Sequence, residues 1–141
     1  MPAQTKLSKT MINAYNTAHY RVIGPPEFTL LIWKKSAELA KLYKAHGVTS
    51  AMFITAYNPY SKKTDRNINI RTQKRLKGDL IREKLVHFEG VGGDAGQWVA
   101  LPSYLVLGVT EDFAREMADK YQQNAVVWAD SDAVPLLILM R

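Results

Sequence analysis

The sequence has 141 residues and a formal net charge of +6, with 47% hydrophobic and 23% charged residues. This length is too short for two well-cored domains, and the composition is not that of a disordered chain, so we expect one globular domain over residues 1–141. The chain has no cysteine, which excludes disulfides, thiolate metal sites and cysteine nucleophiles and favours a cytoplasmic protein. Its longest apolar run, residues 134–140, is too short to cross a bilayer, and the N-terminus has no stretch of signal-peptide type, so no membrane association is predicted.

Hydrophobic periodicity and turn residues predict five elements in the first part of the chain. Ser8 precedes apolar residues at helical spacing and is expected to cap a short amphipathic helix. The turn at Gly24 joins two strands into a hairpin. Ser36 opens a second helix, and Gly47 ends it. The expected ranges are a helix over 8–17, strands over 19–23 and 28–33, a helix over 36–47 and a strand over 51–57.

Residues 64–83 are predicted to form a long helix with mostly basic faces. Nine lysines and arginines against three acids in residues 61–84 give this segment a charge of +6, and the rest of the chain cancels to zero. This surface can attract phosphate groups or an acidic protein, or it only keeps the helix solvated. The residues expected to face the core are Ile68, Leu76, Leu80 and Ile81.

In the last part of the chain, the hydrophobic pattern and the turn residues predict four strands and one helix. Four glycines in residues 90–96 indicate a loop. The other expected ranges are strands over 85–88 and 104–107, a helix over 111–121, and a terminal hairpin of 125–128 and 135–139. The order of elements predicts an α+β fold, a two-layer sandwich in which a mixed sheet with terminal β-hairpins is covered by about four helices, one of them long and basic.

The first candidate site is the segment between a buried strand and the basic helix, residues 55–61. Ligands gather at the carboxyl ends of strands in open α/β sheets, and free N–H groups at a helix N-terminus attract an anion. Asn58 and Ser61, with Thr64, would supply further hydrogen bonds. The alternative is that Asn58 and Pro59 form only a turn and that Ser61 or Thr64 caps the helix.

Two later segments also carry polar side chains. The glycine loop holds Asp94 and leads to Trp98 and Ser103, which would place a carboxylate, an aromatic face and a hydroxyl at a pocket rim. The loop lacks the spacing of known phosphate-binding motifs, and the alternative is a flexible connection. Gln123 and Asn124 are adjacent amides that could read a nucleobase or sugar edge. The alternative is that Asn124 takes a left-handed conformation at the end of a helix.

The histidines give no sign of a metal site. His19, His46 and His87 have no paired spacing and no nearby pattern of carboxylates. No serine stands in the strand-turn-helix motif of a hydrolase nucleophile. The sequence therefore predicts no metal and no cofactor.

The segments ITAYNPYS, GVGGDAGQW with LPSYLVLG, and QQNAVVW followed by VPLLIL together resemble a family of small bacterial proteins, domain of unknown function 3293. The likeness extends from about Tyr15 to Leu139. The family patterns read approximately ITAxNPxS, an Asn seven residues before a helix Leu, G-x-G-x-D-x-x-G-x-W, Glu-Pro-Ser and QNAxVW. The resemblance implies a shared pocket lined by Asn, Ser, Asp, Gln and Trp, and no established activity. The matching positions are Asn58, Pro59, Ser61, Asn69 before Leu76, Asp94, Trp98, Pro102, Ser103, Gln123, Asn124 and Trp128.

Two departures from the family pattern bear on activity. Leu101 stands where the family has an acid before Pro-Ser, and the glycine loop is shifted and shortened around Asp94. If the family site uses that carboxylate, this chain binds its ligand without turning it over.

Three functions are compatible with these features. The first is binding of a phosphate-bearing ligand, a nucleotide or nucleic acid, at a polar pocket beside the basic helix. The second is a protein-interaction module, or an inhibitor from a phage or mobile element, that docks the basic helix on an acidic partner. The third is an enzyme that acts on a small metabolite with Asp94 as general base. The residues assigned to the first function are Asn58, Ser61 and Asn69 for the polar part of the ligand, Arg71 and Lys74 for phosphate, and Trp98 or Gln123 for a base.

Overall fold

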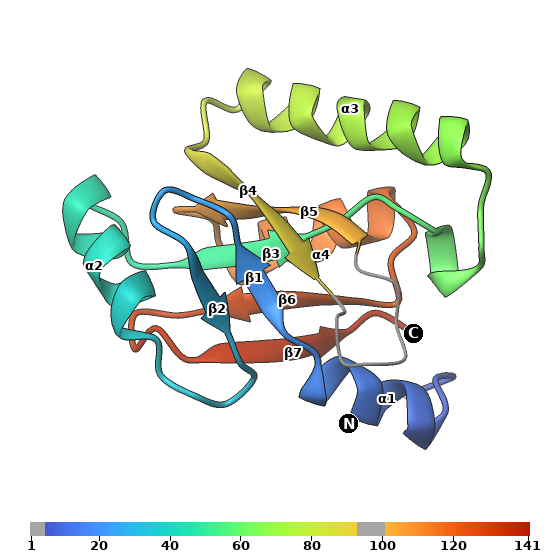
Figure 1. Ribbon diagram of the computed structural model, residues 1–141, viewed down its shortest axis with the longest axis horizontal. Coiled ribbons are helices and arrows are strands. Elements are labelled where there is room, and N and C mark those ends of the chain that lie inside the picture. The colour runs from blue at the N-terminus through green and yellow to red at the C-terminus, as the bar shows by residue number, and fades with distance from the viewer. Residues whose placement is uncertain (1–4, 93–100) are drawn as a thin grey trace.

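The computed structural model describes residues 5–92 and 101–141, which form four α-helices, one 3₁₀ turn and seven strands (Figure 1). The helices are α1 (Lys9–Thr17), α2 (Ala37–His46), α3 (Arg66–Arg82) and α4 (Glu111–Lys120), and the 3₁₀ turn is η1 (Pro59–Ser61). The strands are β1 (Tyr20–Val22), β2 (Phe28–Leu30), β3 (Ala51–Ile54), β4 (His87–Gly92), β5 (Leu101–Leu107), β6 (Ala125–Ala129) and β7 (Pro135–Leu139). None of the described helices combines the length and the apolar composition that crossing a membrane requires.

All seven strands form one sheet in the order β2-β1-β4-β5-β3-β6-β7, and every neighbouring pair is antiparallel. The α+β class is confirmed, and so are the two terminal hairpins, β1 with β2 and β6 with β7. The expectation of a mixed sheet is wrong. The crossover through α3 does make β4 parallel to β3, but β5 lies between them. The crossover through α4 likewise places β6 parallel to β5 on the far side of β3.

The sheet curls until its two edges approach each other. Just after β2, the backbone N–H of Trp33 donates to the carbonyl of Pro135 in β7 at 2.8 Å, and Ser36 donates to Ala133 at 2.9 Å. Figure 1 accordingly shows the β1–β2 hairpin in front of β6 and β7. The curled sheet therefore has a concave inner face, which packs around part of the core, and an outer face, which is covered by helices.

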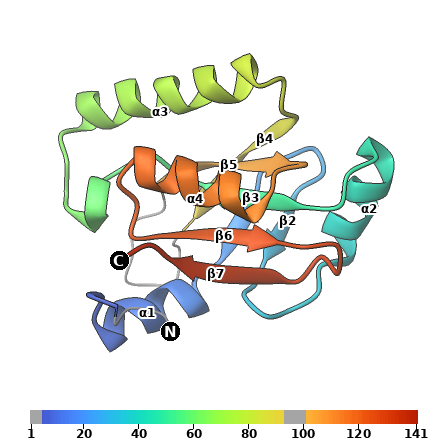
Figure 2. The ribbon, with the colours of Figure 1, turned by 180° about the vertical axis from the view of Figure 1, so that it is seen from behind.

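Apolar side chains fill both faces of the curled sheet. The inner core includes Phe53, Leu105 and Val127 from the sheet and Leu39 and Leu42 from α2. The outer core includes Met52 and Val106 from the sheet and Leu76, Leu80 and Met117 from α3 and α4. Figure 2 shows α4 across this outer face. The helical layer expected of a two-layer sandwich is therefore present on one face, while the curl and α2 close the other.

The buried face of α3 differs from the predicted stripe. Ile68 is 46% exposed and Ile81 is 58% exposed, so both predictions were wrong, whereas Leu76 and Leu80 are fully buried as expected. The buried residues of α3 are Asn69, Gln73, Leu76, Asp79 and Leu80. Polar side chains can occupy this face because they hydrogen-bond to buried partners there.

Strand β4 begins later than predicted and continues through residues expected to form a loop. It includes Gly90, where an added Cβ would lie 2.7 Å from Cε2 of Phe53 and 2.8 Å from the carbonyl oxygen of Arg21. Glycine is needed here for close packing, and its loop-forming character misled the prediction. Residues 93–96 of the expected loop lie outside the described residues.

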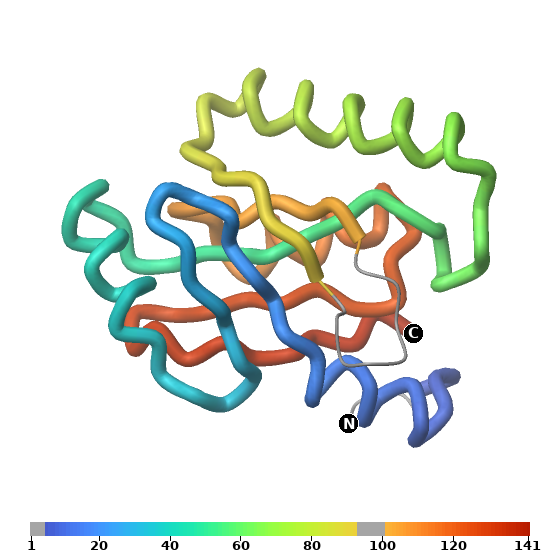
Figure 3. Tube along the Cα trace, in the orientation of Figure 1, coloured from blue at the N-terminus to red at the C-terminus, as the bar shows by residue number. Residues whose placement is uncertain are grey.

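The N-terminal helix lies at the end of the sheet near the C-terminus (Figure 3). Ser8 caps α1 as predicted, accepting from the backbone N–H of Met11 at 3.1 Å. The side chain of Thr5 donates to the carbonyl of Arg141, which joins the two ends of the described chain. No residue of α1 is buried, although Met11, Ile12 and Tyr15 are half-buried.

Candidate functional site

The chain between β3 and α3 has an unusual backbone. Asn58, Tyr60 and Ser61 have φ angles of 48°, 54° and 61°, in the left-handed region that non-glycine residues rarely adopt. The backbone N–H of Tyr60 donates to the carbonyl of Gln122 at 2.6 Å. Such a conformation persists only where the surroundings hold it, and it is concentrated at functional sites.

Asn69 of α3 holds this loop from behind. Its side chain is buried, and its Nδ2 donates to Oδ1 of Asn58 at 2.8 Å and to the carbonyl of Thr64 at 3.3 Å. Its Oδ1 accepts from the backbone N–H of Asn58 at 2.9 Å. Oδ1 of Asn58 also accepts from the backbone N–H of Thr64 at 3.2 Å. One buried amide thus closes the loop over residues 58–64.

Gln73 of α3 holds the residues directly after β3 through hydrogen bonds of its side-chain amide. Its Oε1 accepts from the backbone N–H of Ala56 at 2.8 Å, and its Nε2 donates to the carbonyl of Pro102 at 3.1 Å. Oγ1 of Thr55 donates to that same carbonyl at 2.7 Å. These bonds tie the end of β3 to β5 and α3 together, so the loop starts from a rigid base.

Ser61 connects the loop to the N-terminal helix. Its Oγ accepts from Nδ2 of the fully buried Asn124 at 2.8 Å and lies 2.6 Å from the hydroxyl of Tyr15. The hydroxyl of Tyr20 in β1 donates to the backbone carbonyl of Tyr15 at 2.5 Å. These contacts hold α1 against the end of the sheet.

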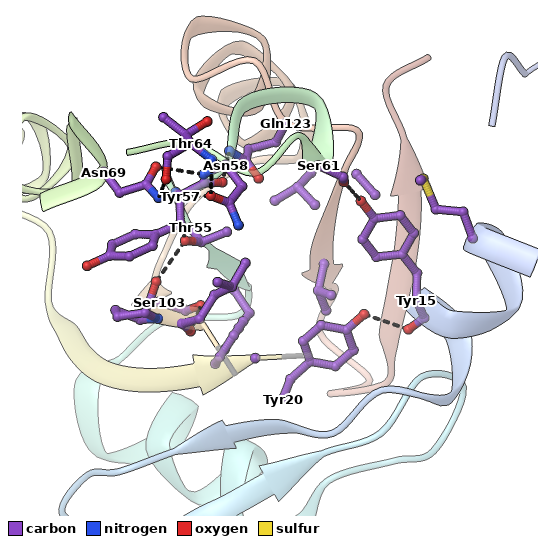
Figure 4. Close-up of a pocket in the computed structure, with 18 of the residues that line it drawn as sticks. Tyr15, Tyr20, Thr55, Tyr57, Asn58, Ser61, Thr64, Asn69, Ser103 and Gln123 are labelled. Atoms are coloured by element: carbon purple, nitrogen blue, oxygen red, sulfur yellow. Dashed lines mark hydrogen bonds between the residues drawn. The ribbon is translucent and has the colours of Figure 1, made fainter. Parts of the chain in front are cut away.

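A cavity of about 760 Å³ lies between the loop, α1 and the sheet (Figure 4). This volume is in the range of small-molecule sites. Its aromatic and apolar lining includes Tyr15, Tyr20, Phe53, Tyr57, Leu101 and Val127. Its polar lining includes Thr55, Asn58, Ser61, Thr64, Asn69, Ser103 and Gln123. The cavity therefore combines aromatic surfaces with several uncharged hydrogen-bonding groups.

The two charged groups among the described lining residues of the cavity are cationic. Lys63 and Arg66 line it, and none of the lining residues that the structure describes is an aspartate, glutamate or histidine. Burial, and then the nearby Tyr15, raise the pKa of Tyr20, so its hydroxyl stays protonated at neutral pH. The described lining thus favours an anion.

The described residues do not form a metal-binding site. Across residues 5–92 and 101–141, no group of three His, Cys, Asp or Glu side chains is arranged to hold a metal ion. What the arrangement can do chemically is bind a ligand through hydrogen bonds, aromatic contacts and two cations.

The family model described as "Protein of unknown function (DUF3293)" matches residues 54–126, slightly more than half of the chain. The chain belongs to this family. The resemblance predicted from the sequence is thereby confirmed, and the match runs from the end of β3 into β6, across the loop and the buried amides of the DUF3293 site. No curated protein and no solved structure matches the chain.

The structure brings together half of the residues predicted for the DUF3293 site. The predicted residues that line the cavity are Asn58, Ser61, Asn69, Ser103 and Gln123. Asn124 stands behind Ser61, to which it donates. Arg71 and Lys74 are exposed on α3 and do not line the cavity. Asp94 and Trp98 lie outside the described residues, so the roles assigned to them stay predictions.

Two local expectations were wrong. The backbone N–H groups of Asn67 and Ile68 at the start of α3 are not free for an anion, because the carboxylate of Asp65 accepts from Asn67 at 2.8 Å and from Ile68 at 3.4 Å. Asp65 is therefore the cap, in place of Ser61 or Thr64. At the end of α4, the residue in the left-handed conformation is Gln122, with φ 54°, and not Asn124.

Several lining residues of the DUF3293 cavity were not predicted. Lys63 and Arg66 belong to the basic segment, but nothing in their spacing separates them from the other cations there. Thr55 stands in the quoted segment ITAYNPYS and could have been chosen from it. Tyr15 and Tyr20 precede the matched residues, and only the strand order brings them to the loop.

Proposed function

We propose that the cavity binds a phosphate-bearing ligand of nucleotide size. The observation that supports this most strongly is the charge of the lining, since Lys63 and Arg66 stand at the cavity without a carboxylate among the described lining residues. A cationic wall concentrates anions, and a guanidinium can bind phosphate through two parallel hydrogen bonds.

The remaining lining suits the organic part of such a ligand. The rings of Tyr20 and Tyr57 offer aromatic contacts, and hydroxyls and amides of the loop offer directed hydrogen bonds. The volume of about 760 Å³ is sufficient for a mononucleotide. A nucleic acid would enter as a single exposed nucleotide or a chain end.

We also propose that the protein is located in the cytoplasm of a bacterium. The absence of cysteine supports the location. The bacterial origin rests on the resemblance to a family of small bacterial proteins.

The double variant Lys63→Glu/Arg66→Glu is expected to weaken binding of ribonucleoside monophosphates at least about tenfold, because two favourable phosphate contacts become repulsive. Isothermal titration calorimetry at low and high salt measures the loss of affinity. The affinity of the variant should also depend less on salt concentration than the affinity of the wild type does.

The matched control is Lys74→Glu/Arg75→Glu, which makes the same change of charge on the exposed part of α3, away from the cavity. This control should bind with close to wild-type affinity. Equal losses in both double variants, or no binding of any nucleotide by the wild type, would contradict a phosphate site in the cavity.

A second function, docking on an acidic protein, is favoured by a separate observation. Arg71, Lys74 and Arg75 are exposed on α3, do not line the cavity and form none of the ion pairs among the described residues. A cationic face without internal partners is available to an anionic surface.

Reversal of Arg71, Lys74 and Arg75 to Glu is expected to abolish capture of an acidic protein from bacterial lysate treated with nuclease. Quantitative mass spectrometry of the captured proteins checks this result, with Lys63→Glu/Arg66→Glu as the control that leaves this face intact. If capture disappears on nuclease treatment alone, nucleic acid and not protein binds the helix.

A further inference from the structure

Two amide side chains at the cavity each have one polar atom that meets no described residue. Nδ2 of Asn58 donates to none of them, and Oε1 of Gln123 accepts from none of them. Both residues line the cavity. Whether each of these atoms is a donor or an acceptor depends on the orientation of its amide group. The hydrogen bonds made by the other polar atom of the same amide determine that orientation.

The orientation of Asn58 follows from a chain of obligatory bonds. Oδ1 of Asn69 faces a backbone N–H, which can only donate, so the other end of the Asn69 amide is its NH₂ group. That NH₂ group donates to Oδ1 of Asn58 at 2.8 Å, and the backbone N–H of Thr64 donates to the same oxygen at 3.2 Å. The remaining atom of the Asn58 amide is therefore the NH₂ group, a donor.

The orientation of Gln123 is fixed in the opposite sense. One end of its amide lies 3.1 Å from the carbonyl of Tyr57 and 3.1 Å from the carbonyl of Tyr121. Carbonyls only accept, so this end is Nε2 and the remaining atom is the acceptor Oε1. Gln123 lines the cavity, and its Oε1 accepts a hydrogen bond from none of the described residues.

The donor and the acceptor belong to neighbouring positions on one wall. The amide of Gln123 is anchored to the carbonyl of Tyr57, which directly precedes Asn58. Figure 4 shows Asn58 and Gln123 side by side at the loop, with Tyr57 beside them. Because each amide is held by two or more hydrogen bonds within the chain, its remaining end is oriented before any ligand arrives.

We infer that Asn58 and Gln123 read the edge of a planar ring that carries a hydrogen-bond acceptor next to an N–H donor. This arrangement stands on the pairing edge of every nucleobase and is absent from a sugar phosphate, so the ligand of the cavity is a nucleotide bound through its base. The inference rests on the proposed phosphate site for the other end of the ligand. It assigns specificity to two side chains and affinity for the anion to Lys63 and Arg66.

The test uses calorimetry on the full chain with the four ribonucleoside monophosphates, their nucleosides and ribose 5-phosphate. The tightest nucleotide should bind at least about tenfold more tightly than ribose 5-phosphate. Its analogue methylated on the ring nitrogen of the pairing edge, N1 of a purine or N3 of a pyrimidine, should lose most of this advantage. The analogue comparison needs no variant of the protein.

The variant Asn58→Asp replaces only the outward NH₂ group by oxygen and keeps the acceptor that Asn69 and Thr64 contact. Its readout is the ratio of affinities for the nucleotide and ribose 5-phosphate, in which the repulsion of phosphate by the new charge cancels. The ratio should fall towards one, while Asn67→Asp on the exposed face of α3 should keep the wild-type ratio.

The outcomes separate this inference from the proposed function. If ribose 5-phosphate or the methylated analogue binds as tightly as the nucleotide, base reading is overturned and the phosphate site stands. If the nucleoside binds as tightly as the nucleotide and its methylated form does not bind, base reading stands and the phosphate site is overturned. If no probe binds, both fail.

Discussion

The variant Asp79→Asn is expected to lower the free energy of unfolding by about 2 kcal/mol at pH 7. Asp79 lies on the buried face of α3 and is 7% exposed. Its Oδ2 accepts from Nζ of Lys120 at 2.7 Å and from the hydroxyl of Tyr121 at 2.5 Å, both at the end of α4. Its Oδ1 accepts from Arg82 at 2.8 Å. One carboxylate thus joins the two helices that cover the outer face of the sheet.

The pH dependence of this effect has a definite sign. Burial raises the pKa of Asp79, but the hydrogen bonds from Lys120, Tyr121 and Arg82 outweigh burial and lower the pKa to about 2, from an ordinary value of 3.8. A carboxyl with a lowered pKa contributes stability above its ordinary pKa and loses it as the pH falls through the folded value. The difference between wild type and Asp79→Asn should therefore be full above pH 4 and should shrink between about pH 4 and pH 2.

Urea unfolding followed by circular dichroism at several pH values checks both parts. The control is Glu116→Gln, an exposed acid of α4 that takes part in none of the ion pairs among the described residues. Its effect should stay within about 0.5 kcal/mol. A difference for Asp79→Asn that persists unchanged at pH 2 would show that the carboxylate charge is not its source.

The variant Asn69→Ala is expected to cost about 3 kcal/mol of stability and to abolish the nucleotide binding proposed for the cavity. It removes the three hydrogen bonds of one buried amide. The backbone N–H and the side-chain oxygen of Asn58 then lose a partner, and the strained backbone of the loop loses its main support.

The matched control is Asn67→Ala, the same substitution two residues earlier on an exposed face of α3. Because alanine favours helix more than asparagine does, this variant should be neutral or slightly stabilising. Thermal unfolding gives the stability of both variants, and calorimetry with nucleotides gives their affinity. Wild-type affinity in a folded Asn69→Ala protein would mean that the loop does not form the ligand site.

Local chemistry in the sequence was sufficient to predict that most elements exist, and to predict the caps of α1 and α2, whereas β2, β3, β4 and β5 have ends that differ from the expected ones by two to four residues. Ser8 and Ser36 cap helices as expected, and Gly47 ends α2 with a φ of 64°. These outcomes depend on hydrogen bonds within a few residues, which a sequence displays directly. Asn58 and Asn69 were both selected from the family patterns, and the structure shows that they hydrogen-bond to each other, a contact that the patterns did not predict.

What could not be predicted depends on segments distant in sequence. The prediction of a mixed sheet was wrong because β5 lies between the parallel strands β3 and β4. Which strand takes such a position is decided by contacts between distant segments, and no local sequence pattern encodes it. Ile68 was placed in the core because it is apolar, although the loop after β3 needed Asn69 and Gln73 on that face. Tyr15 and Tyr20 reach the cavity only through the same strand order.

The position of β3 in the sheet also determines when the protein can fold during synthesis. Both sheet neighbours of β3, which are β5 and β6, follow it by about fifty residues or more. On the ribosome the buried segment Ala-Met-Phe-Ile of β3 therefore has neither strand partner until β5 emerges about fifty residues later. A sheet whose centre depends on such distant pairing folds slowly for its size, and its nascent chain presents a natural binding site for chaperones.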